Sequence, residues 1–120
     1  MKERTYAPGE SPSTEWEKFA LSFVETLVAQ RYEQAHLMLA GKFRAEHSVE
    51  WLRSHIERLL VQSQEPFGPC HVFMSNPGPE PTDLGMSYVV IGGEFNEAIS
   101  PIVVSEAGQF RVRDLFIGRP

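Results

Sequence analysis

The hydrophobic period of the chain changes near residue 62, and this change decides the class of fold. Before it, apolar residues recur every three or four positions, as they do along the buried face of an α-helix. After it, prolines and glycines break the chain as far as residue 85, and short runs rich in β-branched and aromatic residues follow. Helices first and strands second predict an α+β domain, with three N-terminal helices packed in a strongly curved antiparallel sheet of about four strands.

Three helices are expected in the first half of the chain. Thr14 and Glu17 have the spacing of a capping box, so the first helix begins here, with Glu17 on its polar side. A short second helix is expected over 30–40, with Gly41 as its C-terminal stop. Ser48 is placed to cap the third helix.

The second half predicts strands joined by turns. Gly92–Gly93 is expected to mark a bulge or a bend, residues 96–97 a turn, and Glu106–Gln109 a hairpin. The segment 76–82 contains too many prolines to pair as a strand. The expected strands are 70–75, 86–95, 99–105 and 110–117.

Charge is distributed unevenly along the chain. The 120 residues carry 16 acidic and 11 basic side chains, a formal charge of −5. No Lys or Arg occurs between Arg58 and Arg111, although acidic residues continue through this stretch. We therefore expect an acidic surface on the first three strands, and no binding of nucleic acid, which requires clustered cations.

The chain has neither an apolar run long enough to span a bilayer nor a secretory signal pattern. Its single cysteine, Cys70, cannot form an internal disulfide, so a cytoplasmic setting is expected, with no membrane contact. Residues 1–12 are expected to be a flexible leader, ordered only by packing against a partner. Residues 13–120 then form a single domain.

Two stretches resemble the NTF2-like superfamily, in particular its small bacterial SnoaL-like members. One is the helical run from Phe23 to Leu60, and the other is the last hairpin, over 102–117. The resemblance implies a cone, in which a strongly bent sheet wraps the helices and leaves a pocket between them. It also implies a homodimer, because many members pair sheet to sheet. The hairpin positions that carry the resemblance are Phe110, Val112, Asp114 and Leu115.

Enzymes of this superfamily place a carboxylate inside the cone, so the resemblance makes Asp114 a candidate base. Strand alternation predicts apolar neighbours for Asp114, which would raise its pKa. His36 or Tyr32 would act beside it as proton donor. The alternatives are that a bulge turns Asp114 toward a neighbouring arginine, and that the His36 ring hydrogen-bonds a backbone carbonyl.

Aromatic side chains are numerous enough to line a pocket for a small apolar ligand, although the same residues could simply fill a core. No metal site is expected, because His47 and His55 are eight residues apart instead of four, and no cofactor motif occurs. The candidate ligand-binding residues are Trp16, Tyr32, Trp51, Phe73, Tyr88 and Phe110.

Three functions are compatible with the sequence. The first is a non-catalytic NTF2-like domain that binds a small apolar ligand in its cone or a protein partner on its sheet, as a homodimer. The second is a small-molecule isomerase, dehydratase or hydrolase that uses Asp114 as base. The third is an immunity protein, whose acidic sheet surface would hold a basic toxin.

Overall fold

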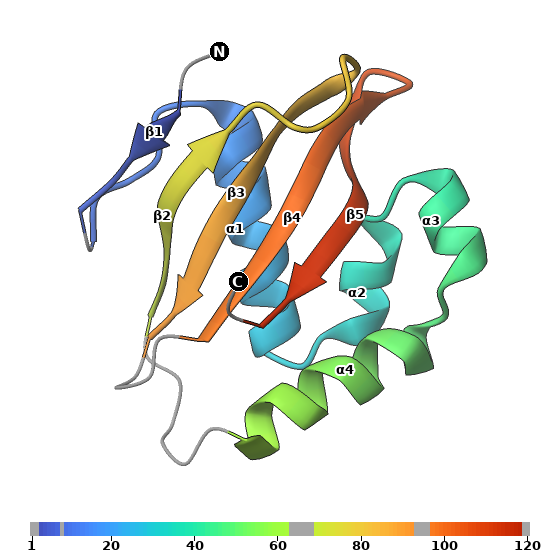
Figure 1. Cartoon of the computed structure of the whole chain (residues 1–120). Helices are drawn as coiled ribbons and strands as arrows, with labels where there is room; N and C mark the ends of the chain where they lie inside the picture. Colours follow the sequence, from blue (N-terminus) through green and yellow to red (C-terminus); the bar gives the residue numbers. More distant parts are fainter. Residues whose placement is uncertain (1–2, 8, 63–68, 93–96, 119–120) are drawn as a thin grey trace.

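The computed structural model describes residues 3–7, 9–62, 69–92 and 97–118, and every count of helices, strands and contacts refers to these residues. Four helices and a five-stranded antiparallel sheet make up the molecule, so the expected α+β class is confirmed (Figure 1). The sheet is open, and its strands follow one another in chain order. The elements are β1 (Arg4–Thr5), α1 (Glu15–Val28), α2 (Tyr32–Leu37), α3 (Gly41–Glu46), α4 (Val49–Gln62), β2 (Cys70–Asn76), β3 (Asp83–Ile91), β4 (Glu97–Glu106) and β5 (Gln109–Ile117).

Helix α1 begins where the capping box predicts, because the Thr14 hydroxyl accepts a hydrogen bond from the Glu17 backbone amide. The expected position of the Glu17 side chain is wrong. It is fully buried, because the N-terminal segment folds over this side of α1 and places Arg4 and Tyr6 against the carboxylate. Strand β1 lies in the same segment and pairs with β2, a pairing that the expectation of a flexible leader over 1–12 did not include.

The second expected helix is interrupted, and Gly41 begins α3 instead of ending a helix. The interruption has a tertiary cause. The Val112 amide donates to the Met38 carbonyl at 2.9 Å, and the Ala40 amide donates to the Val112 carbonyl at 2.7 Å. The chain therefore leaves the helix at residue 38 to pair with the edge strand β5, and it becomes helical again only afterwards.

The last helix and the last hairpin form as predicted. Ser48 caps α4, since its hydroxyl accepts from the Trp51 amide at 3.1 Å. The β4–β5 hairpin closes through Ala107 and Gly108, whose φ angles of 52° and 78° are those of a two-residue type I′ turn. The bend expected at Gly92–Gly93 and the turn expected at 96–97 lie partly outside the described residues.

The sheet contains three irregularities, at Phe73 in β2, Leu84 in β3 and Arg113 in β5. At each of them the pairing register shifts by one residue. A β-bulge of this kind places two successive side chains against one on the neighbouring strand, so the alternation between the two faces of the sheet changes at that point. The bulges therefore decide which side chains point toward the helices and which point away.

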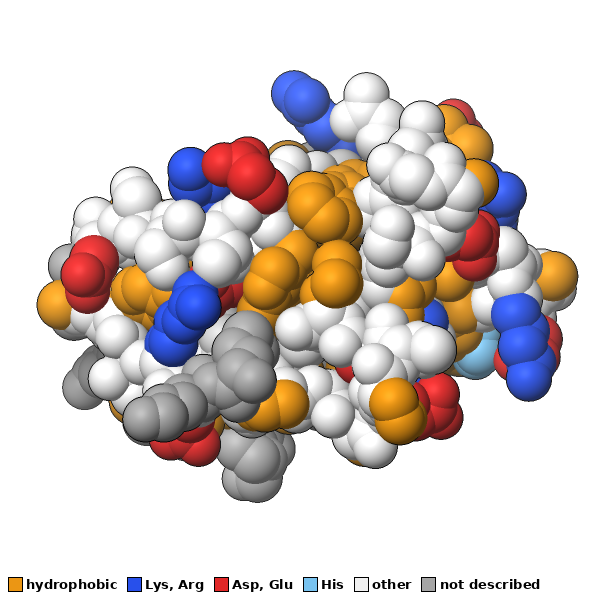
Figure 2. All heavy atoms as spheres, turned by 90° about the horizontal axis from the view of Figure 1, so that it is seen from above, with side chains coloured by type: hydrophobic (Ala, Val, Ile, Leu, Met, Phe, Trp, Pro, Cys, Tyr) orange, Lys and Arg blue, Asp and Glu red, His pale blue; other side chains and the backbone are white. Residues whose placement is uncertain are grey.

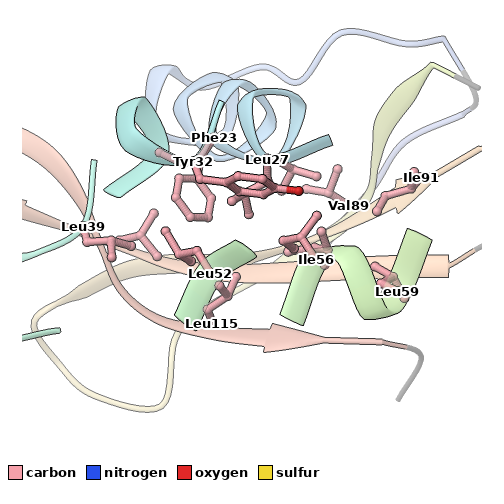
Figure 3. Close-up of a cluster of buried hydrophobic side chains, with 14 of the residues drawn as sticks. Phe23, Leu27, Tyr32, Leu39, Leu52, Ile56, Leu59, Val89, Ile91 and Leu115 are labelled. Carbon is pink, nitrogen blue, oxygen red and sulfur yellow. The ribbon is translucent and has the colours of Figure 1, made fainter. Parts of the chain in front are cut away.

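The hydrophobic core lies between the inner face of the sheet and the helices (Figure 3). Leu27 of α1, Leu52 and Ile56 of α4, and Val89 of β3 converge there and are almost fully buried. A smaller cluster forms around Trp16, which packs so closely on β3 that a Cβ atom at Gly85 would lie 2.4 Å from its ring. Among the described helices, none is long and apolar enough to cross a membrane.

Candidate functional sites

The structure places Asp114 on the outer face of the sheet, away from the helices. Val112 and Leu115 both point into the core, and the bulge at Arg113 accommodates the extra residue between them. Asp114 therefore lies opposite Ile102 on the other face, where its carboxylate accepts a hydrogen bond from the Leu115 amide at 2.8 Å. The alternative that a bulge reorients Asp114 is correct about the bulge, but the hydrogen-bond partner is the Leu115 amide instead of an arginine, and simple strand alternation does not describe the geometry.

The bulge residue Arg113 forms an ion pair with Asp83 that joins the β3 and β5 irregularities. Two guanidinium nitrogens of Arg113 donate to the two oxygens of Asp83, whose side chain has no solvent exposure. This hydrogen bonding holds the pKa of Asp83 below its usual range, against the opposing effect of burial. The pair has a structural role, because the two charges neutralise each other and link β3 to β5.

Tyr32 and His36 lie one turn apart on α2, and neither lines the cleft that contains Asp114. The His36 ring nitrogen Nε2 donates to the His47 carbonyl at 2.7 Å, so His36 takes the backbone-bonded arrangement. Tyr32 is 4% exposed, and its hydroxyl has no hydrogen-bond partner in the described part of the chain. Burial raises the pKa of Tyr32, and Glu57 adds to this effect while Arg53 opposes it. The structure therefore does not bring the three expected catalytic residues together.

The expected ligand-binding aromatics divide among separate places. Trp16 and Phe110 lie in the small inner cluster, and Tyr32 lies in the main core. Phe73 and Tyr88 lie on the outer face of the sheet, with ring centroids 5.9 Å apart. Apart from Tyr32, these side chains do not line the interior between α1 and α4.

Trp51 belongs to an aromatic stack on the surface of α3 and α4. Its ring centroid lies 4.3 Å from that of His47 and 4.3 Å from that of His55. The Nδ1 atom of each histidine bonds the carbonyl of the residue four positions earlier, which holds the rings in this orientation. No group of three or more potential metal ligands occurs among the described residues.

The outer face of the sheet carries a band of apolar side chains that no described helix covers. In Figure 1, α1 lies behind the sheet, and β2, β3 and β4 are open toward the viewer. Phe73 and Phe116 mark the two sides of this band and are 47% and 53% exposed. Tyr88 and Ser100 lie between them, since Tyr88 pairs with Met74 beside the β2 bulge and Ser100 pairs with Phe116. The outer band, as we call it, consists of Phe73, Met74, Met86, Tyr88, Val90, Ala98, Ser100, Ile102 and Phe116. Its polar member Ser100 is buried, and so are Val90, Ala98 and Ile102.

Sequence reasoning missed the outer band because the bulges create it. Alternation from Val72 would predict Met74 on the inner face. The bulge at Phe73 instead places the side chains of Phe73 and Met74 both on the outer face. The one available signal was a local excess of large apolar residues in strands whose inner positions were already occupied.

Carboxylates lie around the outer band and not within it. The only charged residues of β2, β3 and β4 are Asp83, Glu97 and Glu106, and each is the first or last residue of its strand. Figure 2 shows another side of the molecule, seen from above, where acidic and basic side chains are interspersed around exposed hydrophobic ones.

A cleft of about 520 Å³ lies between α3, the loop before β3 and the β4–β5 hairpin. Three of the charged side chains that line it already have partners. Glu106 accepts from the Gly41 amide at 3.1 Å, Arg113 is paired with Asp83, and Asp114 accepts from its neighbouring amide. The cleft thus offers side chains of both signs and, among the residues described, no buried polar group without a partner.

Comparisons with known proteins give no match for this chain: none with a protein-family model, none with a curated protein and none with a solved structure. The fold and the sites of the molecule are therefore the basis for assigning a function.

Proposed function

We propose that this chain is a non-catalytic domain of the NTF2-like type that pairs with a second copy of itself through the outer band. The exposure of Phe73 and Phe116 on a sheet face without helices is the observation that carries the proposal. Between these two rings the apolar side chains Val90, Ala98 and Ile102 are buried, so Phe73 and Phe116 are the parts of the outer band that a second copy would contact first.

The charge of the face favours a second copy over a charged partner. A basic partner needs carboxylates in the contact, but the acidic residues of β2, β3 and β4 stand at strand ends, and Asp83 is neutralised by Arg113. The outer band itself is uncharged, so its best complement is another uncharged apolar face. A second copy presents such a face.

The size of the face also fits pairing. Four strands spaced by about 4.8 Å give a width of roughly 19 Å, and strands of nine or ten residues are about 30 Å long. This flat area is of the same order as the roughly 800 Å² that each partner buries in a standard interface. Two sheets packed through these faces would form a closed sandwich with the helices outside.

Sedimentation equilibrium tests the proposal. We expect the wild-type chain to be dimeric at micromolar concentration and the Phe73→Ser, Phe116→Ser double variant to be monomeric. Leu37→Ser is the matched control, because Leu37 is 63% exposed on α2 and lies off the sheet. Added salt should not weaken pairing, since it screens the repulsion between two chains of charge −5. A monomeric wild-type chain would contradict the proposal.

The Tyr32 hydroxyl supports a second candidate function, the binding of a small apolar molecule inside the cone. It is buried near Leu27, Ile56 and Val89 (Figure 3) and has no hydrogen-bond partner among the described residues, and a ligand with one hydrogen-bonding group would satisfy it. Methyl NMR signals of Leu27 and Ile56 should then shift with cyclohexanone, and should shift less in Tyr32→Phe. Unchanged signals would count against this candidate.

A further inference from the structure

The buried carboxylate of Glu17 connects α1 to the N-terminal segment. Glu17 has no solvent exposure. It accepts hydrogen bonds from the Tyr6 hydroxyl at 2.8 and 2.9 Å, from the Thr14 hydroxyl at 2.6 Å and from an Arg4 guanidinium nitrogen at 3.2 Å. A buried carboxylate is tolerated only when such donors surround it, so the folded state requires Arg4 and Tyr6 to stay in place.

Strand β1 depends on this connection. It has only two residues, which pair with Ser75 and Met74 of β2, and a strand of this length has little stability of its own. Arg4 belongs to β1, and Tyr6 lies immediately after the strand. The side chains of both lie on the helix-covered side of the sheet, where they reach Glu17. In Figure 1, β1 lies alongside β2 at the edge of the sheet.

The same segment ends on the bulge that shapes the outer band. The Tyr6 amide donates to the carbonyl of Phe73 at 2.9 Å, and Phe73 is the extra residue of the β2 bulge. The ring of Phe73 lies on the outer face against Tyr88. One continuous set of contacts thus leads from Glu17 on the inner side, through the pairing of the N-terminal segment with β2, to the most exposed side chain of β2 on the outer side.

From this geometry we infer that residues 4–7 and 9–14 form a latch, closed by Glu17, which holds the β2 bulge in the form that presents Phe73 for pairing. Glu17 is accordingly a positioning residue for an interface that it does not touch. When the latch opens, Phe73 loses the backbone contact that fixes it, and the edge of β2 loses its neighbouring strand. The inference rests on the proposed pairing of two copies, and its test separates the two.

Two variants weaken the latch by different means, and a third is the control. Tyr6→Phe removes one donor to Glu17, and Glu17→Gln removes the charge that Arg4 and Tyr6 bind. Glu15→Gln changes an exposed carboxylate in the same helical turn, where the pair with Lys18 contributes little. Tyr6→Phe carries the test should Glu17→Gln fail to fold.

Two readouts are measured on the full chain: hydrogen exchange of the residue 6 amide, which bonds Phe73, and the dissociation constant of the dimer. In Tyr6→Phe and Glu17→Gln we expect faster exchange and about tenfold weaker pairing, and in Glu15→Gln neither change. Faster exchange with unchanged pairing would overturn the coupling to the outer band. Unchanged exchange would overturn the role of Glu17, and a monomeric wild-type chain would overturn the proposed pairing while the exchange data still test the latch.

Discussion

At the scale of single residues, two buried polar groups distinguish this core. Glu17 and Tyr32 are both shielded from solvent, but Glu17 receives hydrogen bonds from several side chains, whereas the Tyr32 hydroxyl has no partner in the described structure. Hydrogen bonds of a buried group contribute to stability, and an unpaired buried group reduces it. Removing a tyrosine hydroxyl should thus have opposite effects at the two sites.

Tyr32→Phe and Tyr6→Phe make the same chemical change in these two surroundings. Because an unpaired buried hydroxyl costs about 1–3 kcal/mol, we expect Tyr32→Phe to raise the free energy of unfolding by about 1 kcal/mol. Tyr6→Phe should lower it by a similar amount, since its hydroxyl donates to Glu17. Urea denaturation followed by circular dichroism measures both values. A destabilised Tyr32→Phe would mean that the hydroxyl is hydrogen-bonded in solution.

At the scale of elements, the sequence predicts what depends on local signals. Thr14 and Ser48 act within three residues of themselves, and the turn at Ala107–Gly108 is specified by its own backbone, so these features form where expected. The interruption at Met38 depends on contacts with β5, more than seventy positions further along the chain. The bulges are set by how each strand pairs with its neighbour and not by the pattern within one strand, and one such bulge moves Asp114 to the outer face.

The contact between α1 and β3 depends on the absence of a side chain at Gly85. A Cβ atom there would lie 2.4 Å from the Trp16 ring and 2.8 Å from the Asn76 carbonyl oxygen, so α1 or β3 would have to move. We expect Gly85→Ala to lower the free energy of unfolding by about 1–3 kcal/mol. Gly41→Ala is the control: its nearest contact would be an ordinary 3.5 Å, and we expect a change within about 0.5 kcal/mol. Equal effects of the two substitutions in thermal unfolding would contradict this explanation.

At the scale of the whole molecule, the chain is a flat, two-layered body. Its principal extents are 39, 33 and 21 Å, and the shortest is close to the thickness of one helix layer packed on one sheet. One broad sheet face is therefore left outside the core. The buried carboxylates Glu17 and Asp83 connect separate parts of this body, the first from α1 to the N-terminal segment and the second from β3 to β5.

These two carboxylates should make the molecule sensitive to acid. Burial acts to raise the pKa of Glu17, but hydrogen bonds from Thr14, Ser75 and Tyr6 together with the charge of Arg4 outweigh burial and lower it. The Arg113 hydrogen bonds lower the pKa of Asp83.

Both groups bind protons more weakly in the folded chain than in the unfolded chain. Their stabilisation is complete above the usual carboxyl pKa of about 4 and is lost as the pH falls through the lowered folded values. The urea concentration at the unfolding midpoint, measured from pH 7 to pH 3, should decrease once the pH is below about 4. This decrease should be less steep in Asp83→Asn than in Glu15→Gln. If the urea midpoints of these two variants depend on pH in the same way, Asp83 does not contribute to the acid sensitivity.

The edges of the sheet determine how large an assembly can become. At one edge, β1 offers only two residues for further strand pairing. At the other, residues 38–40 already bond Val112, and the bulge at Arg113 bends the remainder of β5. Short, covered or bent edges prevent one sheet from extending into the next. Molecules that associate through their faces but not through their edges stop at a closed pair, so a chain with a broad apolar surface is protected against growth into fibres.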